Sequence, residues 1–196
     1  MTSRTPTVTT KDRVVQAATE LFGSLGYAAT SMEQVRRRAG VSNGSLYHLF
    51  PDKVTLGGYL FGAGMHECQA GLLAVIADAD AAQQGIRNAV AWQLGWVDDN
   101  AATARILYGD VPDDVMVAAA AVHDPSARNY VRTTTQWLNR HVLEGSIVDR
   151  PFAVTHALWL GPTQEYSRHW LRGRVKQRPR RVAADLSAGA WAAVST

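Results

Sequence analysis

Apolar residues recur at intervals of three and four positions along nearly the whole chain, and this spacing is what most restricts its fold. The spacing places apolar side chains on one face of an α-helix, where they can pack against a neighbouring helix. Alternation of apolar and polar residues, which would indicate a β-strand, never lasts more than a few positions. We therefore predict an all-α protein whose core forms between helices.

Three short helices are expected within the first fifty residues. The second of them begins with Ser31 and Gln34 in the spacing of a capping box, in which each side chain bonds the backbone N–H of the other residue. The third covers residues 43–50 and turns its apolar residues toward the other two. Glycine commonly follows the last residue of a helix because it tolerates the left-handed conformation. The boundaries are predicted at Thr9 or Thr10, Gly26, Ser31, Gly40, Ser42 and Pro51.

Longer helices with larger apolar residues are expected from residue 52 onward. Residues 1–53 are therefore predicted to form a small helical N-terminal domain, and residues 54–196 a second, larger helical domain. The Asp124–Pro125 pair is expected to separate two helices, because proline cannot continue the hydrogen bonds of a helix. The predicted helices cover residues 52–79, 81–97, 101–109, 113–122, 124–145, 150–173 and 180–194.

Charge is unevenly distributed along the chain. Residues 1–53 carry a net charge of +3, residues 54–146 carry −5, and residues 147–196 carry +5. A basic N-terminal domain joined to an acidic segment suits a protein with one end that binds a polyanion. The basic stretch over residues 172–181 is interpreted as a solvated loop.

A glycine-containing turn joins the second and third helices, and the third carries small polar and aromatic residues on its outer face. This arrangement is typical of a helix-turn-helix, which places its second helix in the major groove of DNA. The motif residues are 17–22 (AATELF), Gly26, Tyr27, Thr30, Ser31, 39–42 (AGVS), 44–50 (GSLYHLF) and Lys53. Over residues 11–60 the sequence closely resembles the N-terminal domain of the TetR family of bacterial repressors.

This resemblance implies a transcription repressor rather than an enzyme, with no cofactor. It implies that the chain binds double-stranded operator DNA as a homodimer, and that a small-molecule effector releases the DNA by shifting the conformations of the dimer. Two alternatives keep the DNA-binding domain. In one, the second domain is a ligand-independent or protein-interaction module, and in the other the protein is an activator.

The resemblance and the chemistry of the side chains together suggest the DNA contacts. Thr30 or Ser31 stands at the positive end of the second helix, where a phosphate can bind. Tyr47 and Lys53 match the family's phosphate contacts, which fix the register on DNA without reading its sequence. One arginine of the run 36–38 is expected at another phosphate. Contacts in the groove are expected from Asn43, Gly44, Ser45 and His48, beside Ser42, which is chiefly a helix cap.

Aromatic and other large side chains recur on neighbouring helices of the second domain. Trp92 and Trp96, for example, lie one turn apart on one helix face. Such a stripe is usually core, but the resemblance also makes these residues candidates for a pocket that binds an apolar or aromatic effector. The candidate ligand-binding residues are Phe61, His66, Trp92, Trp96, Tyr108, Met116 and Trp137, with Gln93, His123 or Asn139 as polar anchors.

The helix predicted over 150–173 combines small residues, which allow close approach, with large ones suited to an interface. Residues 160–173 resemble the penultimate helix of TetR-type proteins, which forms a four-helix bundle with its twin. The alternative is that Trp159 and Trp170 fill only the core of one protomer. The candidate dimer-interface residues are Leu158, Gly161, Pro162, Glu165, Tyr166, His169 and Trp170.

Other kinds of site receive little support from the sequence. Residues 40–44 (GVSNG) fit the hydrolase motif G-x-S-x-G with Ser42 as nucleophile, but that motif needs a preceding strand, and residues 33–39 are charged and helical. A single cysteine, Cys68, is interpreted as a buried small residue, and no metal site is predicted. No uninterrupted apolar stretch reaches the roughly 20 residues of a membrane span, so we expect a cytoplasmic protein without a membrane partner.

Overall fold

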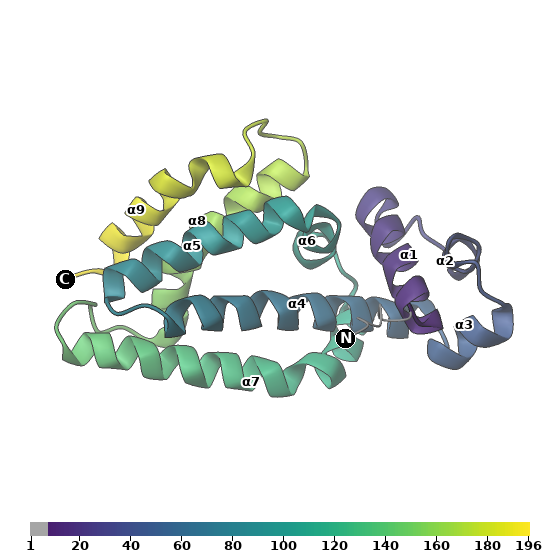
Figure 1. The fold of residues 1–196 in the computed structure, drawn as a ribbon, viewed down its shortest axis with the longest axis horizontal. Helices are drawn as coiled ribbons and strands as arrows, with labels where there is room; N and C mark the ends of the chain where they lie inside the picture. Colours follow the sequence, from purple (N-terminus) through teal and green to yellow (C-terminus); the bar gives the residue numbers. More distant parts are fainter. Residues whose placement is uncertain (1–7) are drawn as a thin grey trace, which may run out of the picture.

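The computed structural model describes residues 8–196, and almost all of this part of the chain is helical (Figure 1). Within it no β-strand forms, and one isolated antiparallel bridge joins Ile147 to Ser195. The prediction of an all-α protein is confirmed. The helices are α1 (Thr10–Leu25), α2 (Met32–Ala39), α3 (Asn43–Leu49), α4 (Lys53–Ala77), α5 (Ala82–Asp99), α6 (Ala101–Tyr108), α7 (Asp113–Leu143), α8 (Phe152–Leu171) and α9 (Ala183–Val194), with a short 3₁₀ helix, η1 (Pro179–Val182), before α9.

The helices form two groups, which we call the head (α1–α3) and the body (α5–α9). Figure 1 shows α4 running from the head through the body, with α7 along one side of it and α5 along the other. Helix α6 packs against α1 at the junction of the two groups. Because α4 contributes Leu56 to the core of the head and Leu72 to that of the body, the boundary between residues 53 and 54 stays a prediction.

Side-chain caps begin the first two helices of the head. The N–H of Asp12 donates to Thr9 Oγ1 at 3.1 Å, and the Asp12 carboxylate accepts from the N–H of Thr9 at 2.9 Å. Ser31 and Gln34 form the predicted capping box, with distances of 3.2 and 2.7 Å. Gly40 ends α2 with a φ of 64°, a left-handed conformation that favours glycine. The sequence-based boundaries of these helices are confirmed.

Helix α7 differs from the prediction. The sequence predicts separate helices over 113–122 and 124–145, but α7 is one helix, Asp113–Leu143, with Pro125 inside it. A proline in a helix interior removes one backbone N–H and costs about 3 kcal/mol. Figure 1 shows α7 lying along α4 over most of its length, so packing on both sides of Pro125 offsets this cost.

Glycines on α4 let this helix approach its neighbours closely. A Cβ atom on Gly58 would lie 2.7 Å from Ala118 Cβ on α7, and one on Gly71 would overlap the ring of Trp92 on α5. These glycines weaken α4 as an isolated helix by about 1 kcal/mol each. In the fold, a larger side chain at either position would hold α4 away from α5 or α7.

Helix α4 also has the length and apolar composition of a membrane-crossing segment, the one such helix among the described residues. Its apolar side chains Leu56, Leu72 and Ile76 are almost completely buried against other helices. In this fold α4 is therefore the central core helix.

Trp159 of α8 is the largest fully buried side chain and lies in the core of the body. Its indole N–H donates to the carbonyl oxygen of Ile86 at 3.0 Å, and its ring stacks on that of Trp137 with 6.0 Å between centroids. A buried indole contributes a large apolar area and needs a partner for its N–H, and both conditions are met here. Trp159 thus fills the core of its own protomer.

Candidate DNA-binding head and ligand sites

Helix α3 lies at the far end of the head, with its polar face open to solvent (Figure 1). Leu46 and Phe50 are buried and hold α3 against the core of the head. Asn43, Tyr47 and His48 are exposed, Tyr47 with 49% of its surface accessible. A short exposed helix braced by two others has the geometry of a recognition helix.

Ser42 caps the N-terminus of α3. Its hydroxyl oxygen accepts from the N–H of Ser45 at 3.1 Å and lies 2.9 Å from the Ser45 hydroxyl. The residue follows the turn after α2 rather than a β-strand, so the sequence match to a hydrolase nucleophile lacks the structure that the motif requires. Gly44 is exposed and Ser45 is half-buried, which leaves Gly44 the more open of the two.

One predicted phosphate contact needs correction. Thr30 is only 2% exposed, and its hydroxyl donates to the carbonyl oxygens of Gly26 at 2.9 Å and Leu21 at 3.3 Å. A buried hydroxyl that closes the turn after α1 cannot also reach a phosphate, so Thr30 is a structural residue. Ser31, the exposed cap of α2, keeps the place predicted for this contact.

Lys53, at the start of α4, lies against the turn between α1 and α2. Its ammonium group sits 4.3 Å from the centre of the Tyr27 ring and donates to the carbonyl oxygen of Ala28 at 3.3 Å. Partial burial lowers the pKa of the Lys53 ammonium. Sequence reasoning did not give Tyr27 a role, because its partner Lys53 is distant along the chain.

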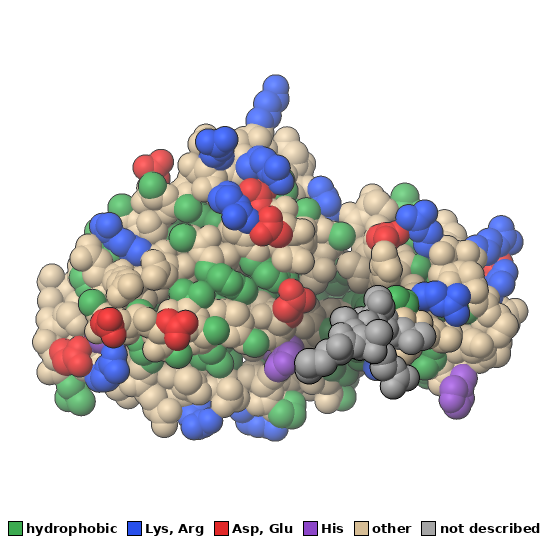
Figure 2. Space-filling model, viewed as in Figure 1, with side chains coloured by type: hydrophobic (Ala, Val, Ile, Leu, Met, Phe, Trp, Pro, Cys, Tyr) green, Lys and Arg blue, Asp and Glu red, His purple; other side chains and the backbone are tan. Residues whose placement is uncertain are grey.

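The three arginines of α2 are all engaged in ion pairs on the surface. Arg36 and Arg37 both bond Glu33, at 2.7 and 2.6 Å, while Arg38 bonds Glu20 of α1 at 2.6 Å. Hydrogen bonds from Arg36 and then Arg37 lower the pKa of the Glu33 carboxyl to about 2. Figure 2 shows Lys and Arg side chains gathered around the end of the head, as expected for a surface that meets a polyanion. A phosphate would have to compete with these exposed carboxylates for an arginine.

The predicted ligand-binding residues do not converge on one cavity. His66 is exposed, and so is Met116 with 42% of its surface accessible. Phe61 packs against the core of the head, whereas Trp137 lies in the core of the body. The reason is geometric, because Phe61 and His66 point to different sides of α4, and Met116 and Trp137 lie about six turns apart on α7.

Of the other three predicted ligand residues, Trp96 belongs to the body core, and Trp92 and Tyr108 pack against it. The rings of Trp92 and Trp96 stack at 6.4 Å and line a hollow of about 250 Å³, and the Trp96 indole donates to Glu67 at 3.0 Å. The Tyr108 hydroxyl accepts from the side-chain amide of Gln93 at 3.1 Å. Burial raises the pKa of the Tyr108 phenol, which keeps it neutral.

Several buried polar atoms of the body have no hydrogen-bond partner among the described residues. They are Oε1 of Gln93 on α5, Oγ1 of Thr134 and Nε1 of Trp137 on α7, and Oγ1 of Thr163 on α8. An unsatisfied buried polar group costs about 1–3 kcal/mol. Each of these atoms would therefore gain from a hydrogen-bond partner.

Some of the predicted dimer residues on α8 face solvent, and the others contact residues of their own chain. Leu158, Pro162 and Glu165 are exposed. Gly161 also faces open space, because a Cβ atom added to it would have no other helix of the described residues within 4 Å. Tyr166 instead donates from its hydroxyl to the carbonyl oxygen of Gln177 at 2.9 Å. His169 lies 3.1 Å from the Glu165 carboxylate, and Trp170 packs at the edge of the body core.

The basic loop between α8 and α9 is held against the end of α5. Arg178 bonds Asp98 at 2.9 Å, and Arg180 bonds Asp99 at 2.5 Å. These ion pairs therefore neutralise two positive charges of the basic loop within the chain.

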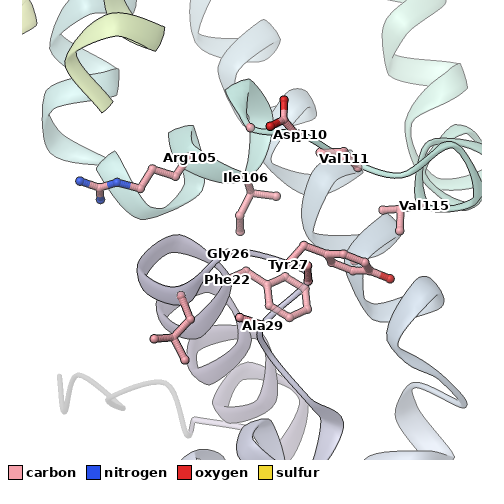
Figure 3. Close-up of a pocket in the computed structure, with 13 residues that line it drawn as sticks. Phe22, Gly26, Tyr27, Ala29, Arg105, Ile106, Asp110, Val111 and Val115 are labelled. Carbon is pink, nitrogen blue, oxygen red and sulfur yellow. The ribbon is translucent and has the colours of Figure 1, made fainter. Parts of the chain in front are cut away.

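A hollow of about 290 Å³, which we call the junction cleft, lies between the head and the body beside the contact of α1 with α6. Figure 3 shows Ile106 directed toward the side of the cleft that carries Phe22 and Tyr27, with the Tyr27 ring extending toward Val115, while Arg105 extends away from the aromatic rings. A second hollow of about 320 Å³, the basic hollow, shares Phe22 and Arg105 with it and is also lined by Arg168 and Arg172. The walls come from segments far apart in the sequence, so no local spacing could have predicted them.

Comparison with known proteins agrees with this architecture. Residues 14–56 match the family model described as bacterial regulatory proteins, tetR family. No curated protein matches the chain in sequence. The match to the family model covers α2, α3 and most of α1, the part of the chain that carries the predicted DNA contacts.

Solved structures resemble the chain over nearly its whole length. A tetR-family regulatory protein from Rhodococcus RHA1 is 22% identical, with a TM-score of 0.71 over 96% of this chain and 98% of that one. The ketosteroid transcriptional regulator KstR2 of Mycobacterium tuberculosis is 16% identical, with a TM-score of 0.72 over 97% of each chain. FadR from Bacillus subtilis, solved in complex with stearoyl-CoA, is 14% identical, with a TM-score of 0.78 over 92% of this chain and 97% of that one.

At these identities the structural likeness establishes the fold, while the sequence match identifies the head. The N-terminal segment is a helix-turn-helix domain of the tetR family, and the chain as a whole has the fold of TetR family transcription regulators.

Proposed function

We propose that the protein is a transcription repressor that binds operator DNA as a homodimer and is released by a small apolar or aromatic effector held in its body. The observation that carries this proposal is the exposed polar face of α3, braced by the buried side chains Leu46 and Phe50. In this role α3 enters the major groove and two heads meet successive half-sites. A cytoplasmic location is part of the same proposal.

The DNA contacts follow from the geometry of the head. Asn43, Gly44 and His48 are exposed on α3, where they can reach base edges, and Asn can pair bidentately with adenine. Tyr47 and Ser31 are exposed beside them and are assigned to phosphates. Lys53 reaches the backbone when its ammonium group leaves the Tyr27 ring. Ser42 and Ser45 are assigned mainly to the cap of α3, because their hydroxyls already lie together.

The outer face of α8 is proposed as the dimer interface. Val154 and Leu158 are exposed there with 45% and 36% of their surface accessible, and Gly161 and Pro162 continue the same face. Small and apolar residues on a solvent-facing helix suit close contact with a second copy. Changing Leu158 to Glu is expected to dissociate the dimer in sedimentation equilibrium, whereas the same change at Leu143, 89% exposed at the end of α7, leaves it intact.

The effector is proposed to enter the body core near Gln93. The unpartnered oxygen of Gln93 would gain a hydrogen bond from a ligand, and aromatic side chains of the body core would contact the apolar part of that ligand. FadR from Bacillus subtilis was solved with stearoyl-CoA, which shows that the same fold can hold a ligand with a long apolar chain. Binding in the core would shift the dimer between conformations that fit and do not fit the operator.

The rival proposal, a regulator with a ligand-independent body, is favoured by the tight packing of Trp137 against Trp159. Thermal-shift screening of the full chain against apolar and aromatic compounds separates the two. A saturating rise in melting temperature that also weakens operator binding supports the effector. Operator binding that no compound alters supports the rival.

DNA binding is tested by gel-shift titration with fragments that the purified protein selects. Tyr47→Ala is expected to weaken binding to all fragments, whereas Asn43→Ala should change preference at particular base pairs by about 1–3 kcal/mol. Val117→Ala, at an exposed position on α7, serves as the control. Equal affinity of all three variants for every fragment would remove α3 from the interface.

A further inference from the structure

We propose that the junction cleft and the basic hollow together bind a small amphiphilic anion, a carboxylate with an aliphatic or aromatic body. This site differs from the effector site proposed in the body core because its walls come from both head and body. The two sites adjoin at Tyr108, which lines the basic hollow and accepts a hydrogen bond from Gln93. The cleft offers an apolar surface, and the adjoining hollow offers cationic groups at one end of it.

The apolar part of the ligand would lie in the junction cleft. Phe22 and Tyr27 meet edge to face there, with ring centroids 5.3 Å apart, and Ile106 of α6 faces them (Figure 3). Leu25, at the end of α1, lines both hollows with 51% of its surface accessible. A volume of about 290 Å³ is at the lower end of the range for small-molecule sites. A bound apolar chain would therefore cover surface that water now contacts.

The charged end of the ligand would be held by Arg105. Arg168 is paired with Glu165, and Arg172 lies 3.3 Å from Asp110, so these guanidinium groups already have acidic partners. Arg105 lines both hollows and forms no ion pair within residues 8–196. The planar guanidinium group suits a carboxylate, to which it can donate two parallel hydrogen bonds. The local charge balance thus favours an anion over a neutral or cationic ligand.

The position of the site couples it to DNA binding. Phe22, Leu25 and Tyr27 belong to the head, whereas Arg105 and Ile106 belong to the body, so one ligand would touch both. A ligand that fills the cleft would contact the end of α1 and α6 at once, beside the place where the two helices already pack, and would restrict movement of the head relative to the body. This consequence rests on the proposed function, in which operator affinity depends on how the two heads are held. Binding of the ligand itself does not depend on it.

The test is calorimetric titration of the full chain with decanoate, and with decanol as the uncharged counterpart. We expect decanoate to bind once per chain, and decanol to bind at least about tenfold more weakly because it lacks the charge that Arg105 meets. Arg105→Gln should weaken decanoate binding by about tenfold or more. Ala29→Trp, at an exposed position that lines the cleft, should block binding while circular dichroism shows the fold intact.

Two control variants locate the ligand. Arg132→Gln removes an exposed arginine of α7 outside both hollows and should leave decanoate affinity unchanged. Gln93→Leu changes the effector site proposed in the body core and serves as the comparison that would detect decanoate binding there. The proposal is overturned by absence of decanoate binding, by equal binding of decanol, or by loss of binding in Gln93→Leu but not in Arg105→Gln. Operator binding without ligand is measured separately by gel shift, so failure of the proposed function would be distinguishable from failure of this site.

Discussion

Replacing Gly58 by alanine is expected to destabilise the protein by about 1–2 kcal/mol, although alanine is the better helix former. The new Cβ atom would lie 2.7 Å from Ala118 Cβ and 2.9 Å from the backbone N of Ala119. Unstrained contacts between carbon atoms lie at about 3.5–4.0 Å, so α4 and α7 would have to separate locally by about 1 Å. Overpacking costs about 1–3 kcal/mol, and the helix propensity of alanine returns about 1 kcal/mol. The net loss of stability is therefore about 0–2 kcal/mol. Because the backbone atoms of α7 cannot rotate away, we expect a value in the upper half of this range.

Urea unfolding followed by far-ultraviolet circular dichroism measures this free energy, with all variants at the same protein concentration. The matched control is Gly44→Ala on α3, where the new Cβ atom has only the Ser42 hydroxyl oxygen at 4.0 Å as a neighbour. That substitution should stabilise the fold by about 0.5–1 kcal/mol through helix propensity alone. The two variants should thus move the unfolding midpoint in opposite directions.

A stability gain in Gly58→Ala equal to that in Gly44→Ala would refute this reasoning, because it would mean that α4 and α7 separate without cost. A lower m-value would instead point to a change in the surface exposed on unfolding, and the comparison would then rest on the melting temperature.

Two further predictions test other parts of the fold. Pro125→Ala should stabilise the protein by about 1–3 kcal/mol in thermal unfolding, because Pro125 is exposed inside α7 and alanine restores the missing backbone hydrogen bond; an unchanged melting temperature would contradict this. Burial, and then the charge of Glu67, raises the pKa of the Cys68 thiol to about 12, so a thiol reagent should label Cys68 only when the chain unfolds. Because the unfolded chain loses the thiol proton at a lower pH than the folded chain, the contribution of Cys68 to stability is complete below the ordinary thiol pKa and declines as the pH rises from that value toward 12. Labelling of the native protein as fast as of the unfolded chain would disprove the burial of Cys68.

Much of the head could be predicted because its signals are local. A capping box such as Ser31 with Gln34 spans one helical turn, and Gly40 marks the end of α2 through its own backbone conformation. The same local chemistry predicted an outward-facing α3, since Leu46 and Phe50 leave only polar positions for solvent. The particular DNA contacts stay predictions, except that Thr30 proved to be buried.

The failures concern residues whose role depends on distant parts of the chain. Pro125 predicted a helix boundary, but packing along α4 holds α7 together. His66 and Phe61 were predicted to line one pocket, yet one is exposed and the other packs against the head. Helical spacing tells which residues share a face and not which neighbour that face will meet.

The sequence by itself determined that the chain is helical, where the helices of the head begin and end, and that α3 presents a polar surface. These properties depend on interactions between residues three or four positions apart, which any reader of the chain can find. Only the tertiary structure decided that Arg105 approaches the end of α1, that α4 joins two cores, and that Gly58 admits α7. Those contacts join residues distant in sequence, and their energy depends on how whole helices pack rather than on any local pattern.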